Sequence, residues 1–194
     1  MLRTLAAAAA FLMATGMAQA EFPTLSEMRS QKAALASRTG ADRTEASAPA
    51  TRGSSSRFAK EAPGTIVIET GERLLHYVEE GGVLRTYRIA VGREGAQWTG
   101  TTHVTGKRKN PEWRPTPNMR RKNPKLPAVV KPGPSNPLGI RAIYLAEGYL
   151  RIHGTNDPSS IGKAVSSGCF RMRNEDVAEL FELVRSGARV KVLR

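Results

Sequence analysis

The sequence holds a single cysteine, Cys169, and a histidine, His153, in the segment before it. A thiolate can attack a carbonyl carbon, and a neighbouring imidazole can take the thiol proton and stabilise the anion as an ion pair. A backbone carbonyl is enough to fix the tautomer of that imidazole. Gly168 lets the backbone turn, so that the N–H groups of Gly168 and Cys169 could hold the oxyanion formed by the attack. These residues predict acyl transfer through a thioester.

The N-terminus predicts export. Arg3 supplies a positive start, residues 5–14 form a short apolar core, and Ala-Gln-Ala at residues 18–20 is a cleavage site. We expect a mature chain in the periplasm or cell-wall space, without stable membrane insertion; the alternative, an uncleaved anchor, needs an apolar run of roughly 20 residues. A lone cysteine is most often a small buried apolar residue. In an oxidising compartment thiols normally pair, so an unpaired Cys169 favours a reactive role.

The charge of the chain predicts an anionic partner. The formal net charge is +13, which indicates an acidic surface or polymer as partner, although it can also serve solubility alone. Nucleic acid is the usual partner of such a chain, but export argues against it. The bacterial wall polymer has carboxylates on its peptide stems and lies in the expected compartment.

The elements that must position the two residues follow from the apolar pattern. Residues 21–62 have few large apolar side chains and predict a flexible low-complexity tether. Residues 63–194 predict one domain, a mostly β sandwich or barrel with one helix. Asn174 is the expected N-cap of that helix and Gly187 its end. The expected strands, each with period-two apolar residues, are 65–69, 74–79, 85–91, 101–105, 140–146, 149–153 and 189–192.

A long basic segment separates the predicted strands. Residues 107–138 hold eight of the chain's twelve prolines, a density that argues against regular helix and interior strand. Long loops of this kind are usually functional. Residues 107–131 hold nine Lys or Arg against one acid, Glu112. We expect a capping loop that binds the anionic wall and covers the substrate, with Trp113 packed beneath it.

Two sequence blocks carry a family resemblance. Residues 152–155 read Ile-His-Gly-Thr, and residues 166–172 read Ser-Ser-Gly-Cys-Phe-Arg-Met. The pair resembles the signature of the L,D-transpeptidase catalytic domain, and the resemblance extends through most of residues 63–194. It implies a β sandwich whose active site lies under a capping loop.

The resemblance also implies roles for individual residues. The family's nucleophile falls on Cys169, its base on His153, and the carbonyl that orients the base on Gly154. Arg171 matches an arginine near the active site, where a forked guanidinium could hold a substrate carboxylate. Many members have histidine at position 167, and Ser167 here removes any second-histidine role. The expected substrate-binding residues are Arg171, Ser167, Trp113 and Thr155.

The reaction implied by the resemblance is attack of the thiolate on the third residue of a tetrapeptide stem of peptidoglycan, with release of D-alanine. An amine of another stem, an amine of a lipoprotein, or water could then resolve the thioester, so cross-linking, protein anchoring and carboxypeptidase or hydrolase action all stay open. A non-catalytic wall-binding protein is the alternative from another class. We expect no cofactor and no metal, because the sequence has neither paired cysteines nor a His-x-x-x-His pair. His76 and His103 are interpreted as structural.

Overall fold

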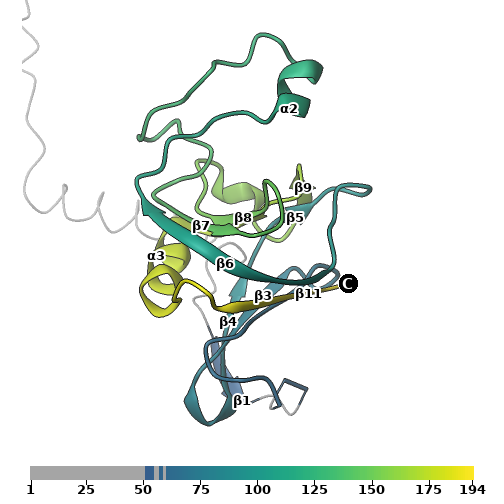
Figure 1. Ribbon diagram of the computed structural model, residues 1–194, viewed down its shortest axis with the longest axis vertical. Helices are drawn as coiled ribbons and strands as arrows, with labels where there is room; N and C mark the ends of the chain where they lie inside the picture. Colours follow the sequence, from purple (N-terminus) through teal and green to yellow (C-terminus); the bar gives the residue numbers. More distant parts are fainter. Residues whose placement is uncertain (1–50, 55–56, 59) are drawn as a thin grey trace, which may run out of the picture. The chain divides into compact units, whose positions relative to one another are not determined.

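The structure is a computed structural model and describes residues 51–54, 57–58 and 60–194 (Figure 1). The predicted signal at residues 1–20 and the predicted tether from residue 21 to residue 50 lie outside the described residues. Within the part that is described, no helix is both long and apolar enough to pass through a bilayer.

Eleven strands and two short α-helices make up the described chain. The α-helices are α2 (Pro117–Lys122) and α3 (Asn174–Leu183), and the 3-10 turns are η1 (Glu80–Gly82) and η2 (Pro158–Ser160). The strands are β1 (Thr51–Ser54), β2 (Ile66–Glu69), β3 (Leu74–Val78), β4 (Val83–Arg88), β5 (Val91–Gly92), β6 (Gly100–Lys109), β7 (Arg141–Leu145), β8 (Arg151–His153), β9 (Ala164–Ser166), β10 (Phe170–Arg171) and β11 (Arg189–Leu193).

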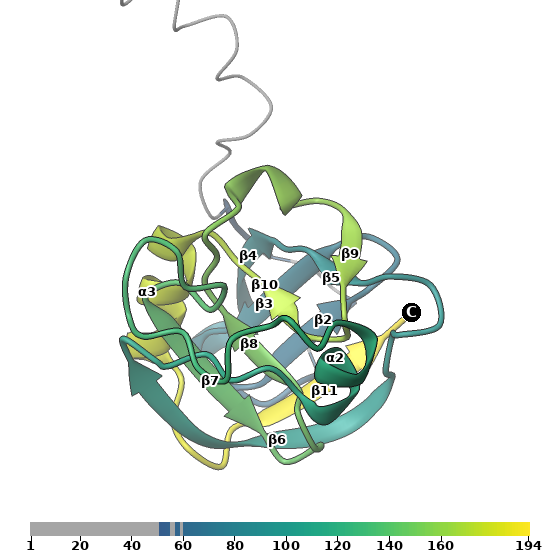
Figure 2. The same ribbon diagram turned by 90° about the horizontal axis from the view of Figure 1, so that it is seen from above.

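Nine of the strands form one sheet in the order β1-β4-β3-β2-β11-β6-β7-β8-β10, while β5 and β9 form a separate pair. The sheet curls around an apolar core, with α3 along one side (Figures 1 and 2). Within it β2–β11 and β8–β10 are parallel, and the remaining pairs are antiparallel. This confirms the predicted mostly β fold, and α3 is the one helix of seven or more residues in the described chain.

β2, in the middle of the sheet, is buried on both of its faces. Ile66 and Ile68 belong to the main core, whereas Val67 points to the other face and packs in a second cluster with Phe58. Alternating side chains of a strand reach opposite faces, so a strand with four apolar or buried residues in a row must be covered on both. β2 therefore needs a partner on its outer face.

Described residues from the predicted tether supply that cover. β1 pairs with β4, Phe58 is only 6% exposed, and Glu61 forms an ion pair with Lys191 at 2.6 Å. The ring of Phe58 also lies 5.3 Å from that of His76. The described residues between 51 and 62 thus pack on the sheet, because the apolar outer face of β2 is buried only when they do.

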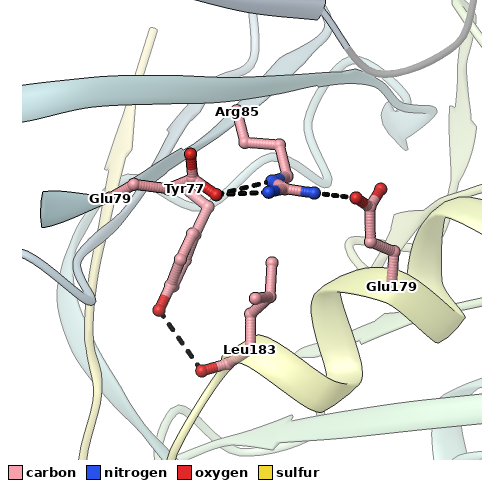
Figure 3. Close-up of polar contacts among 5 residues, drawn as sticks. All are labelled: Tyr77, Glu79, Arg85, Glu179 and Leu183. Carbon is pink, nitrogen blue, oxygen red and sulfur yellow. Dashed lines mark hydrogen bonds and ion pairs between the residues drawn. The ribbon is translucent and has the colours of Figure 1, made fainter.

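A buried arginine joins α3 to the sheet. Arg85 on β4 forms ion pairs with Glu79 and with Glu179 of α3, and the hydroxyl of Tyr77 donates to the carbonyl of Leu183 at 3.2 Å (Figure 3). Arg85 is 8% exposed. A buried guanidinium needs such partners, since an unpaired buried charge is costly. These contacts hold the helix against the sheet at its C-terminal half.

The ends of α3 differ from the prediction. Arg173, not Asn174, is the N-cap, and Asn174 is the first helical residue. The helix ends at Leu183, with Val184 as C-cap, and Gly187 lies beyond it in the turn before β11. The side chain of Asn174 is used elsewhere, in contacts with the loop that follows β8.

The proline-rich segment is more regular than predicted. β6 runs to Lys109, and the segment contains α2. The prolines do not prevent this helix, because Pro117 is at its start, where a missing N–H costs no hydrogen bond. Thr116 caps it by accepting from the amide of Met119 at 3.3 Å. Backbone hydrogen bonds between Trp113 and Val130 then join the two arms of the segment.

Candidate active site

The register of two short strands gathers the candidate residues. β8 and β10 are parallel neighbours, with Ile152 opposite Phe170 and His153 opposite Arg171. Ile152 and Phe170 are buried in the core. Because side chains alternate along a strand, His153 and Arg171 lie on the other face, and Cys169, just before Phe170, shares it. The register of β8 and β10 therefore fixes the positions of Cys169, His153 and Arg171.

These side chains line a pocket of about 220 Å³. The proline-rich residues 107–138, here called the capping segment, form its other wall and extend above β8, with α2 at the far tip (Figures 1 and 2). The members of that wall are Trp113, Thr116, Asn118, Met119, Lys122, Pro137 and Leu138. The structure thus places His153, Cys169 and Arg171 around one pocket with Trp113 and Ser167.

His153 is buried and neutral near neutral pH. Its Nδ1 is 2.6 Å from the carbonyl oxygen of Gly154, which fixes the proton on Nδ1 and leaves a lone pair on Nε2. Burial, the largest cause, lowers the pKa of His153, the hydrogen bond to Gly154 raises it, and the charges of Arg171 and Arg151 lower it; together they bring the pKa to about 4. Nε2 can therefore accept a proton at any pH well above 4.

Cys169 is a thiol in the resting site. Its Sγ donates to the carbonyl oxygen of Tyr149 at 3.3 Å. Burial raises the pKa of Cys169 above its ordinary value of 9.0, while Arg151, through its charge and through hydrogen bonds from its backbone and side chain, and Arg171, through its charge, lower it. Transfer of the proton to His153 requires the thiol to leave the carbonyl of Tyr149.

Gly168 shapes the turn before Cys169. Its φ is +127°, a region that disfavours any side chain, and a Cβ there would meet the carbonyl oxygen of Ala96 at 3.1 Å. Its N–H donates to Ser166 Oγ at 3.1 Å, and the same hydroxyl donates to the carbonyl of Cys169 at 2.6 Å. The role of Gly168 as an oxyanion donor stays a prediction, and it requires the hydrogen bond to Ser166 to break.

One expected substrate-binding residue, Thr155, lies outside the pocket lining. Thr155 is 1% exposed. Its hydroxyl accepts from the amide of Asp157 at 3.0 Å and so closes a local turn. Hydroxyls of threonine often satisfy the backbone two residues on, and Thr155 is therefore a turn residue. Ser167, by contrast, is at the pocket, 3.5 Å from Arg93 Nη1.

The sequence did not predict the role of the Asn174 side chain, which holds the turn after His153. Its Oδ1 accepts from the amides of Thr155 at 3.2 Å and Ile140 at 3.3 Å, and its Nδ2 donates to the carbonyl of Thr155 at 2.9 Å. A Cβ at Gly139 or Gly154 would overlap this Oδ1. The glycines flanking the predicted motifs could have indicated such a close approach.

The sequence model of the L,D-transpeptidase catalytic domain matches residues 63–192. The chain belongs to this family. Among its relatives, ErfK/SrfK, a probable L,D-transpeptidase of Escherichia coli (strain K12), is 41% identical over 137 residues, which cover 66% of this chain and 43% of that protein. YkuD of Bacillus subtilis (strain 168) is 35% identical over 133 residues, 68% of this chain and 67% of that protein.

The fold of this L,D-transpeptidase family member is also that of solved structures. L,D-transpeptidase 3 from Mycobacterium tuberculosis superposes with a TM-score of 0.54 and 15% identity, covering 67% of this chain and 60% of that one. The matched region spans less than half the length of ErfK/SrfK.

Arg151 is the second residue of this site that sequence reasoning missed. It lines the pocket and lies beside Cys169 when the register of β8 and β10 is continued by one residue. It is two positions before His153, so period-two alternation in the predicted strand 149–153 could have placed it on the same face.

In the described chain, no group of three or more His, Cys, Asp or Glu is close enough to hold a metal ion.

Proposed function

We propose that this family member is a peptidoglycan L,D-transpeptidase that works as a cysteine acyltransferase. Cys169 is the nucleophile, His153 its base, and the carbonyl of Gly154 orients the base. The observation that carries the proposal is the shared pocket. The chain's single cysteine and a neutral buried histidine, with its Nδ1 already bonded to a carbonyl, line it together under the capping segment.

The chemistry runs in two half-reactions. Nε2 of His153 takes the thiol proton, and the sulfur lone pair forms a C–S bond to the carbonyl of the third stem residue. The tetrahedral intermediate collapses, the C–N bond to D-alanine breaks, and His153 returns the proton to the leaving amine. An acceptor amine then attacks the thioester, loses a proton to His153, and Cys169 leaves as the thiolate.

The charges of the pocket fit an anionic donor. Four cations line it, and none of its described lining residues is Asp or Glu. A peptide stem offers carboxylates, and guanidinium groups bind carboxylates through paired hydrogen bonds. Arg171, directly opposite His153, is the proposed carboxylate holder. The lining cations are Arg93, Lys122, Arg151 and Arg171.

The proposed setting is the periplasm or cell-wall space. The N-terminal signal features and the net charge of +13 support it. The proposed partners are peptidoglycan stems and, as an acceptor, a wall-anchored lipoprotein, with no nucleic acid. Neither a cofactor nor a metal enters the proposed mechanism.

The test uses residues 21–194, with Cys169→Ala as the matched control. Each protein is incubated with defined tetrapeptide muropeptides, and the products are weighed by mass spectrometry. Cross-linked dimers from the unaltered protein alone support the transpeptidase. Tripeptide monomers would assign carboxypeptidase action to the same site. Identical products from both proteins would contradict the proposal and leave a wall-binding protein.

A further inference from the structure

A thiolate at Cys169 needs a positive charge beside it. The pocket offers two candidates, the imidazolium of His153 and the guanidinium groups of its arginines. β8 contributes Arg151 and His153, and β10 contributes Arg171. The rim adds Arg93 and Lys122, and no carboxylate among the described lining residues opposes these cations. The uncharged neighbour of the sulfur is the carbonyl of Tyr149. The question is which cation balances the sulfur anion.

The imidazolium of His153 is poorly suited to that task. The ring is 4% exposed, and its Nδ1 already bonds to the carbonyl of Gly154 at 2.6 Å. A protonated ring would place a third positive charge between Arg151 and Arg171, whose charges both lower the pKa of His153. Burial and like charge therefore both oppose a long-lived imidazolium.

The guanidinium of Arg151 is better placed to balance the charge of a Cys169 thiolate. Continuing the register of β8 and β10 by one residue places Arg151 beside Cys169 on the pocket face, and its guanidinium lies 5.6 Å from the centre of the Tyr144 ring on β7. Its Nε is buried and has no hydrogen-bond partner among the described residues. A buried donor without an acceptor costs free energy, and a sulfur anion beside it would supply the missing acceptor.

We propose that the guanidinium of Arg151, rather than the imidazolium of His153, is the counter-charge of the Cys169 thiolate in the free enzyme. This rests on the proposed function, in which Cys169 is the nucleophile. On ionisation in the free enzyme the S–H bond breaks, its electron pair stays on sulfur, and the proton passes through Nε2 of His153 to water; only when a stem is bound does His153 keep the thiol proton and return it to the leaving amine. In the free enzyme His153 thus carries the proton only in passing, and Arg151 remains beside the anion.

The test is the pH dependence of Cys169 alkylation by iodoacetamide, followed by intact mass. Arg151→Met should raise the pH midpoint by about one unit or more, the shift typical of a lost opposite charge at close range. Alkylation at pH 7 should then slow by about tenfold. Arg151→Gln, which keeps a polar side chain, should shift the midpoint in the same direction, and Arg151→Lys should restore most of it.

His153→Asn is the discriminating variant. If Arg151 is the counter-charge, His153→Asn should move the midpoint by less than about half a unit. Arg93→Gln removes a pocket charge from the rim and is the matched control, with a shift expected to be smaller than that of Arg151→Gln. Circular dichroism and melting curves for each variant establish that the fold is kept.

Two results would overturn the inference: an unchanged midpoint in both Arg151→Met and Arg151→Gln, or a rise in His153→Asn as large as that in the Arg151 variants. Alkylation needs no stem peptide, so failure of the proposed function would appear separately, as an absence of acyl-enzyme with muropeptides. A failure of this inference alone would leave acylation intact and the alkylation midpoint of the Arg151 variants unmoved.

Discussion

Asn174 links α3 to the turn after His153, the proposed base. Removing the Asn174 side chain should lower both stability and activity. Asn174→Ala removes three hydrogen bonds, two to the backbone of Thr155 and one to the amide of Ile140. At about 1 kcal/mol for each bond, the loss is about 2–3 kcal/mol, since the two bonds to Oδ1 are long. For a domain of this size that lowers Tm by roughly 6–12 °C.

The same change should slow acylation, because the loosened turn contains Gly154, whose carbonyl orients His153. A fall of about tenfold or more in the acylation rate is expected from the misplaced base. Asn156→Ala is the matched control, since that side chain makes one exposed hydrogen bond, to the carbonyl of Ser135. Equal melting temperatures and equal acylation rates in the two variants would refute the reasoning.

Three further predictions follow from the structure. Phe58→Ala should cost about 3 kcal/mol in urea unfolding, because it uncovers the outer face of β2; a change under about 1 kcal/mol would show that Phe58 contributes little to the stability of the domain. Since His153 is a base only when deprotonated and its pKa is about 4, kcat/KM should rise with pH through an acid limb near 4, and a limb at 6.5 would contradict the burial argument. Replacing four exposed cations of the capping segment by Gln should weaken sacculus binding at low salt more than the same replacement outside it, whereas equal binding would remove the segment's proposed role. The first set is Arg120, Arg121, Lys125 and Lys131, and the control set is Arg73, Arg185, Arg189 and Arg194.

The apolar pattern located several strands, because each has at least one face buried. β2, β3, β7 and β11 lie within a residue or two of the predicted ranges. β9 and β10 have three and two residues, too few to show any period, yet β10 is the strand that sets Cys169 and Arg171 beside β8. The family signature, rather than the apolar pattern, was needed to locate them.

The remaining errors have local physical causes. Proline density predicted a loop, but Pro117 at the first position of a helix removes only an amide that has no partner there. Thr155 belongs to the signature, but its hydroxyl is satisfied by the amide of Asp157. Phe58 sits in a polar segment whose composition predicts a tether, and only the apolar outer face of β2 explains its burial. The packing of Phe58 against Val67, Val78 and Leu84 depends on how the chain folds back on itself, which the composition of the segment cannot show.

The central claim is that Cys169 becomes acylated by a peptidoglycan stem with His153 as the base. The most direct measurement is the intact mass of the protein during turnover of a tetrapeptide muropeptide, with peptide mapping of the modified residue. The account predicts a tripeptide-stem adduct on Cys169 that forms quickly in the unaltered chain and far more slowly in His153→Asn. No adduct in the unaltered chain, or one that forms at the same rate without the imidazole, would contradict it.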